Sequence, residues 1–151
     1  MKYSEGSIGR IFVMRLEDGD KLPAAIEGFA AAKGVGRAMC MLVGGIDEGG
    51  NIVVGPSDRE TMPPEPMLFR LTGVHEVCAV GTLFPDTLGK PRLHMHAALG
   101  RKGETHTGCI RPGVDVWKLG EVILLEILNN SATRRRDPDT GFDVLEVDDE
   151  M

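Results

Sequence analysis

The chain has 151 residues, enough for one domain whose hydrophobic core is large enough to be stable without disulfide or metal cross-links. Hydrophobic residues make up 42% and charged residues 26% of it, as in ordinary globular proteins, which excludes a disordered chain and a coiled coil. The 17 basic and 23 acidic side chains give a net charge of −6. This is the wrong sign for a protein whose affinity depends on neutralising phosphates, so direct DNA binding is disfavoured but not excluded.

Two elements are predicted near the start of the chain. Residues 10–16 (RIFVMRL) are rich in β-branched residues and end at a turn sequence, which predicts a first strand. From Asp20 the apolar residues recur at three- and four-residue steps as far as Lys33. This period predicts a helix, with Asp20 as its N-cap and Pro23 in its first turn.

A glycine-rich segment at 44–50 lies between two apolar runs, residues 36–43 and 51–54. This arrangement predicts a hairpin of two strands. The glycines lack the Lys-Ser/Thr pair of a Walker loop and lead into no helix, so they do not indicate a phosphate-binding loop. The next segment, 55–66, carries four prolines, which exclude a central strand and predict an exposed loop over a site or an interface.

Short segments typical of an antiparallel sheet fill most of the remaining chain. The predicted strands are residues 67–71, 74–84, 93–99, 104–110 and 122–128, each bounded by Gly, Pro, Asp or Asn. Together with the earlier elements they predict an α+β domain, formed by an antiparallel sheet of about seven strands with one main helix.

The C-terminal segment combines three consecutive arginines at 134–136 with an acidic end at 146–150. The first interpretation is a solvated terminus, and the alternative is that the arginines hold an anion.

No apolar run approaches the roughly 18 residues that span a bilayer, and the start of the chain lacks an apolar export segment, so we expect a cytoplasmic protein with no membrane partner. The three cysteines are an odd number, and we expect them to be reduced.

The residue types that bind metals are concentrated between positions 93 and 110, which contain three of the four histidines and one of the three cysteines. On a strand, His94 and His96 project from one face. If residues 100–103 form a four-residue hairpin loop, Cys109 lies opposite His94, and all three side chains share that face. Imidazole and thiolate suit zinc, and three protein ligands leave a fourth position for water or substrate.

Several alternatives to this site remain open. A register slip of one residue would replace Cys109 by His106, because the slip reverses the face of every side chain on that strand. A fourth ligand could come from Glu76, from Glu104 or from a neighbouring subunit. The histidines could instead bond to backbone groups, with Cys109 packed as an ordinary small apolar residue.

A longer pattern surrounds the three candidate ligands. It comprises Leu93-His94-Met95-His96, the glycines at 100 and 103, Gly108-Cys109, Gly113 and Glu121-Val122-Ile123. The pattern resembles the plant and prokaryote conserved (PPC) domain, whose members carry L-H-x-H, a glycine-containing turn, G-G-H, a later glycine and E-V. This resemblance puts Cys109 at the family's third histidine. It covers about residues 8–145, the expected domain, and leaves residues 146–151 as an acidic tail.

The resemblance implies a homotrimer and, in some members, a metal ion held by the three histidines. Plant members join the domain to AT-hooks in nuclear regulators, and many prokaryotic members carry a DNA-binding label by that association; the present chain has no R-G-R-P hook. The fold is also similar to acetolactate decarboxylase and to a zinc-dependent ester hydrolase. We therefore expect a binding or regulatory module with zinc, or another divalent transition metal, at His94, His96 and Cys109. A metal-dependent lyase or hydrolase of a small carbonyl or ester substrate is the alternative.

Overall fold

The computed structural model describes residues 1–147, which form one helix and eleven strands. The helix α1 is Ala24–Lys33. The strands are β1 (Ser7–Glu17), β2 (Lys21–Leu22), β3 (Ala38–Ile46), β4 (Asn51–Pro56), β5 (Pro66–Arg70), β6 (His75–Pro85), β7 (Pro91–Arg101), β8 (Glu104–Cys109), β9 (Val114–Leu128), β10 (Thr133–Arg136) and β11 (Asp143–Glu146). No helix within the described residues is long and apolar enough to cross a membrane.

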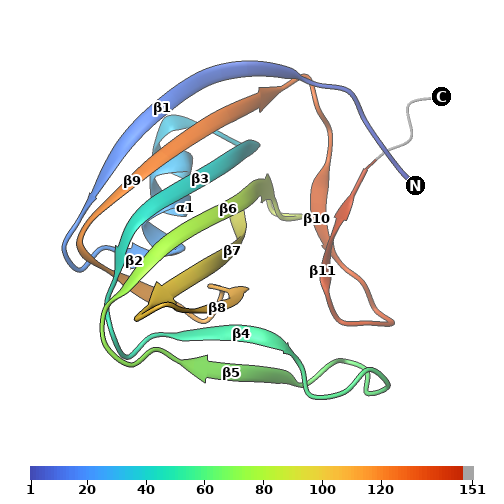
Figure 1. Cartoon of the computed structure of the whole chain (residues 1–151). Helices are drawn as coiled ribbons and strands as arrows, with labels where there is room; N and C mark the ends of the chain where they lie inside the picture. The colour runs from blue at the N-terminus through green and yellow to red at the C-terminus, as the bar shows by residue number, and fades with distance from the viewer. Residues whose placement is uncertain (148–151) are drawn as a thin grey trace.

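Nine strands form one antiparallel sheet, in the order β1-β9-β3-β6-β7-β8-β4-β5, with β2 paired to β9 beside this path. β10 and β11 pair with each other as a separate two-stranded hairpin. Figure 1 shows the sheet curving from β1 round to the β4–β5 ribbon, α1 behind β3 and β9, and the β10–β11 hairpin standing away from the sheet. The predicted α+β class is confirmed, although the strands are more numerous than predicted.

The two faces of the sheet differ in character because successive side chains of a strand point to opposite sides. On β7 the side chains of Leu93, Met95, Ala97 and Leu99 are buried. They join a core that includes inward side chains of β3, β6 and β9, together with Ile26 and Ala30 of α1. The alternate residues of β7 lie on the outer face, and these include both histidines of the candidate site.

The helix begins later than predicted. Its N-cap is Pro23 rather than Asp20, and no side chain caps it. Asp20 instead accepts a hydrogen bond from the backbone N–H of Glu17 at 2.8 Å, within the turn after β1. Between Asp20 and the helix, β2 pairs with the start of β9. Residues 21–22 are therefore held in the sheet, and the helix begins only after them, although the apolar residues of the segment follow a helical spacing.

The predicted hairpin of residues 36–43 with 51–54 is wrong. β3 lies between β6 and β9, and β4 lies between β5 and β8. Because β3 has a partner on each side, it has no free edge for β4. The first three residues of the glycine-rich segment, 44–46, belong to β3, and residues 47–50 connect distant positions of the sheet. The proline-rich segment is an exposed loop at residues 57–65, as predicted, although β4 and β5 include its first and last prolines.

The prediction of a solvated terminus around residues 134–136 is also wrong for its first arginine. Arg134 lies in β10 and is only 8% exposed. The hairpin is anchored to the sheet by a bridge between Asp86 and Arg134 and by hydrogen bonds from Arg134 to Thr82. The predicted acidic tail at residues 146–151 lies outside the described residues from position 148 onward.

Candidate metal centre and its cavity

The β7–β8 hairpin determines which side chains share a face. Its turn consists of Lys102 and Gly103, which both have positive φ, 53° and 83°. This two-residue turn, rather than the predicted four-residue loop, pairs Cys109 with His96 instead of His94. The pairing differs by two positions from the prediction, and a shift of two keeps every side chain on its predicted face.

The structure brings together the three predicted ligands. One ligand atom from each of His94, His96 and Cys109 lies within 4.8 Å of the other two. The Nε2 atoms of the two histidines are 3.1 Å apart. Both imidazoles are exposed, whereas Cys109 is 4% exposed. His106 is not part of the cluster: it lies on the opposite face, where its ring stacks on Phe69 with centroids 3.9 Å apart.

Gly108 allows the strands to approach closely beside the cluster. A Cβ atom at this position would lie 2.5 Å from the backbone oxygen of Val53 in β4. Val53 is paired with Cys109, so this contact joins β4 to β8 at the cysteine. The absence of a side chain at residue 108 therefore helps to fix the backbone that carries Cys109.

The carboxylates considered as a fourth ligand are located elsewhere. Glu76 and Glu104 line a different surface depression together with Arg101. No Asp or Glu within residues 1–147 joins the three-residue cluster. The remaining histidine, His75, is 3% exposed and its Nδ1 is 2.8 Å from the backbone oxygen of Gly73. Within the described chain, the cluster therefore offers three ligands and an open side.

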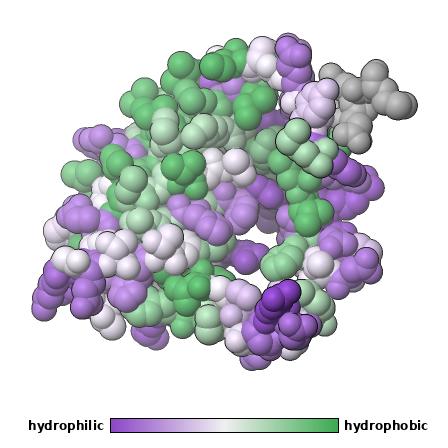
Figure 2. Space-filling view, turned by 45° about the vertical axis from the view of Figure 1, so that its right-hand side comes forward, coloured by the Kyte–Doolittle hydropathy of each residue, from purple (hydrophilic) through white to green (hydrophobic). Residues whose placement is uncertain are grey.

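That open side faces a cavity of about 960 Å³. Its lining comes from the outer face of β7 and β8, from the proline-rich segment between β4 and β5, and from the β10–β11 hairpin. Figure 2 shows the molecular surface hollowed between the body of the sheet and the strands opposite, with hydrophilic side chains inside the hollow. A cavity of this size matches the pockets that bind small organic molecules.

Three arginines line this cavity: Arg111 was not predicted as a functional residue, whereas residues 134–136 were considered as an anion site but were not placed beside the metal cluster. Arg111 follows β8, and Arg134 and Arg136 lie in β10. The His94 imidazole is only partly covered by its neighbours, but this loss of solvent contact lowers its pKa, and the positive charges of Arg134, His96 and Arg111 lower it further. Both effects favour the neutral imidazole, the form that binds metals. The run of arginines in the sequence was a signal, but it did not reveal that the hairpin turns back onto the sheet.

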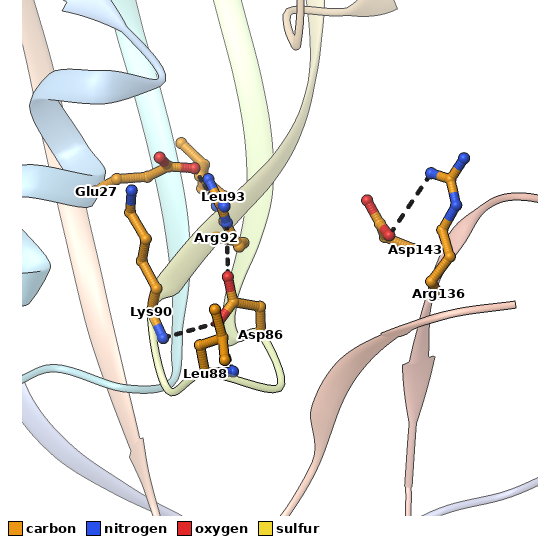
Figure 3. Close-up of polar contacts among 8 residues, drawn as sticks. All are labelled: Glu27, Asp86, Leu88, Lys90, Arg92, Leu93, Arg136 and Asp143. Carbon is orange, nitrogen blue, oxygen red and sulfur yellow. Dashed lines mark hydrogen bonds and ion pairs between the residues drawn. The ribbon is translucent and has the colours of Figure 1, made fainter.

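The turn before β7 supports this wall of the cavity. Asp86 accepts backbone hydrogen bonds from Leu88 and Lys90 and pairs with Arg92 at 3.0 Å. The backbone hydrogen bond from Lys90 is the largest cause that lowers the pKa of the Asp86 carboxyl. Figure 3 shows this turn across a gap from the Arg136–Asp143 pair of the hairpin. The carboxylate of Asp86 thus rigidifies the turn to which the hairpin is bridged.

The family of the chain follows from comparison with known proteins. The family model of the Plants and Prokaryotes Conserved (PCC) domain matches residues 3–128. The chain belongs to the PCC domain family. This is the family that the sequence pattern resembles, and its matched region contains all three clustered side chains. The β10–β11 hairpin lies beyond the matched residues. No curated protein matches the chain.

Solved structures agree with this membership. The metal-containing protein of Archaeoglobus fulgidus is 28% identical, with a TM-score of 0.83 over 97% of this chain and 99% of that one. The PPC protein of Pyrococcus horikoshii is 22% identical, with a TM-score of 0.82 over 97% of both chains. A protein of Bacteroides thetaiotaomicron with a proposed DNA-binding role is 18% identical, with a TM-score of 0.71 over 95% of this chain and 99% of that one.

Proposed function

We propose that this PCC domain protein is a zinc-binding module, in which His94, His96 and Cys109 hold the ion. The observation that carries the proposal is the convergence of two imidazole nitrogens and one thiol sulfur from adjacent strands, within 4.8 Å of one another. A tetrahedral zinc ion with Zn–N distances of about 2.0–2.1 Å would hold two ring nitrogens about 3.3 Å apart. The 3.1 Å separation of the histidine Nε2 atoms fits this requirement. The similar Archaeoglobus fulgidus protein is described as metal-containing, which supports the proposal.

The proposed ligands differ in charge when they bind the ion. The two imidazoles bind as neutral ligands, and Cys109 binds as a thiolate, which brings one negative charge into a buried position. Arg134 lies close enough for its charge to interact with that of Cys109. Bound zinc would supply a Lewis acid and an exchangeable fourth position. We take the functional unit to be residues 8–145, because the hairpin completes the cavity around this position.

Elemental analysis of protein purified without chelator tests this proposal. We expect about one zinc ion per chain, and we expect His94→Ala to lose it while the circular dichroism spectrum stays unchanged. His106→Ala is the matched control, because His106 lies on the same hairpin but faces away from the cluster, and it should keep the ion. Absence of any stoichiometric metal in the wild type, or full occupancy in His94→Ala, would rule out the site.

We further propose that the module forms a homotrimer and acts in the cytoplasm. Its outer sheet face exposes Ile11, Val13, Met41, Val43 and Val80, with Val13 79% exposed. Such a contiguous apolar face supports burial against another copy. Sedimentation analysis tests the assembly: the wild type should sediment as a trimer, and Val13→Glu should dissociate it. A monomeric wild type would contradict this part of the proposal.

An accessory role in DNA binding is a further candidate, which the proposed role of the Bacteroides thetaiotaomicron protein motivates. The net charge of −6 opposes it, and three of the arginines line the cavity instead of forming an outer basic surface. A DNA-binding protein loses affinity steeply as salt rises, because binding releases counterions. We expect no such salt-dependent binding of duplex DNA by this chain, and a gel-shift titration in low and high salt measures it.

A metal-dependent lyase or hydrolase of a small carbonyl or ester is the second candidate. It requires space for a substrate beside the ion, and the cavity contains the three proposed ligands in its lining. None of the similar proteins described above is named for such an activity. Zinc-loaded protein that hydrolyses 4-nitrophenyl acetate faster than His94→Ala would favour this candidate, and equal rates would count against it.

A further inference from the structure

Basic side chains gather in the cavity of an otherwise acidic protein. Arg111, Arg134 and Arg136 all line it. Asp143 is the only carboxylate among the described lining residues, and it lies 3.8 Å from Arg136. The other two arginines form no ion pair with a carboxylate of the lining. The net charge of the chain is −6, so the cavity has the opposite sign to the protein as a whole.

Arg134 is the more constrained of these two arginines. Its Nη2 atom donates to the backbone oxygen and to Oγ1 of Thr82, at 3.2 and 2.9 Å. Its Nε atom is buried and has no hydrogen-bond partner within residues 1–147. Burial lowers the pKa of the guanidinium, and only the charges of Asp143 and Cys109 oppose this. A buried cation with an unused donor is costly, and a bound anion would offset that cost.

Arg111 adds a second unpaired charge beside the cluster. No carboxylate within residues 1–147 forms an ion pair with Arg111 or Arg134. The charges of both arginines act on His94. An anion held between them would therefore lie next to the open side of the cluster.

The rest of the lining is largely apolar. It includes Pro56, Pro63, Pro66, Leu68, Phe142 and Val144. These residues come from the proline-rich segment with β5 and from the β10–β11 hairpin, which are far apart in the sequence. A ligand that fits both parts of the lining needs an anionic end and an apolar body.

We propose that the cavity binds a small organic carboxylate, whose carboxylate group is held by Arg111 and Arg134 and whose apolar part lies against the proline-rich segment. A planar guanidinium matches a carboxylate through paired N–H donors. This inference rests on the proposed role of the cavity as a ligand site beside the metal, but the arginine contacts themselves do not require the ion. Arg111 lies within the residues that the family model matches, whereas the hairpin that supplies Arg134 lies beyond them.

Calorimetric titration of the full chain tests the proposal with three probes: benzoate, the uncharged isostere benzamide and inorganic phosphate. Each probe is titrated into zinc-loaded and metal-free protein. We expect benzoate to bind saturably to both forms and benzamide to bind at least tenfold more weakly. Equal binding of benzoate and benzamide would overturn the proposal. Phosphate binding without benzoate binding would also overturn it, because the site would then select a compact oxyanion without an apolar body.

Two variants locate the anion within the cavity. Arg111→Gln should weaken benzoate binding about tenfold, because it removes a charge-assisted contact. Arg59→Gln makes the same change in charge in the exposed loop, outside the cavity lining, and should leave binding unchanged. Unchanged affinity in Arg111→Gln would overturn the proposal. This variant is preferred to one at Arg134, whose side chain also anchors the hairpin.

The same titrations separate this inference from the metal proposal. Benzoate binding by a protein that takes up no zinc would support the anion site and reject the zinc site. Zinc uptake without benzoate binding to either form would reject the anion site alone.

Discussion

Two antiparallel hairpins line the cavity, and they are held in place in different ways. The β7–β8 hairpin lies inside the sheet, with β6 on one side and β4 on the other. The β10–β11 hairpin pairs with no strand of the sheet and is anchored through Arg134, to Thr82 and to Asp86. The candidate metal ligands thus lie on strands inside the sheet, whereas two of the arginines lie in a hairpin with few contacts to it. We therefore expect substitutions in the two hairpins to affect the proposed metal binding and the proposed anion binding separately.

The two hairpins should differ most in how much stability is lost when one leucine in each is replaced by alanine. Leu99 of β7 is fully buried, and Leu99→Ala should reduce the free energy of unfolding by about 2–5 kcal/mol, because it leaves a cavity in the core. Leu145 of β11 is 40% exposed, and Leu145→Ala should cost less than about 1 kcal/mol. Urea unfolding measures both values. Similar losses in the two variants would show that the hairpins are equally integrated.

A smaller effect is expected at the junction of β8 with β4. In Gly108→Ala the new Cβ would meet the backbone oxygen of Val53 at 2.5 Å, so the two strands must separate. We expect a loss of about 1–3 kcal/mol in the free energy of unfolding and weaker zinc binding, since Cys109 follows directly. Gly89→Ala is a control for the loss of glycine flexibility, because its positive φ is strained but nothing lies within 4 Å of its Cβ. It should destabilise the fold without affecting zinc binding.

The candidate ligands were predictable from the sequence because their arrangement is local. His94 and His96 share a face on any strand, and a short turn returns Cys109 to that face. The predicted register was wrong by two positions because Lys102 and Gly103 form a tighter turn than the glycine spacing indicated. Only an odd shift would have replaced the cysteine by His106.

The cavity was not predictable, because it depends on contacts between distant segments. Arg134 is separated from Thr82 by 52 residues, and nothing in the local pattern of the tail indicates that contact. The helix start shows the same limitation, since Asp20 has the chemistry of an N-cap, yet the pairing of β2 with β9 delays the helix. Patterns within one segment indicate which residues share a face, whereas partners brought in by tertiary packing decide what covers that face.

Acid should destabilise the sheet at Glu126 without breaking the hydrogen bonds between Arg134 and Thr82 that hold the second hairpin. In the sheet, the buried Glu126 carboxylate accepts hydrogen bonds from Arg10, and these lower its pKa to about 2. Because the pKa in the folded state lies below the unfolded value, the stabilisation is present above pH ~4.5 and is lost as the pH falls toward 2. The hydrogen bonds from Arg134 to the neutral Thr82 should not titrate in this range.

Urea unfolding at pH 7 and pH 3 tests this expectation. The wild type should lose stability between these values, and Glu126→Gln should lose about 1–2 kcal/mol less, because it lacks the titrating carboxylate. An equal loss in the variant would assign the acid response to other carboxylates, such as Asp86.

The smallest effect is expected from the anchor of the β10–β11 hairpin. Thr82→Val keeps the shape of the side chain but removes the Oγ1 acceptor, which lies 2.9 Å from Nη2 of Arg134. The loss should be about 0.5–1.5 kcal/mol of docking free energy, with little change in global unfolding, because the hairpin contributes few core contacts. Amide hydrogen exchange should therefore accelerate in β10 and β11 while protection in β7 remains.

Zinc content should not change in Thr82→Val, although Thr82 is paired with His94 in the sheet. Accelerated exchange in both hairpins would mean that the arginine-bearing segment is part of the cooperative core, and metal and anion binding would then be coupled through one unfolding unit.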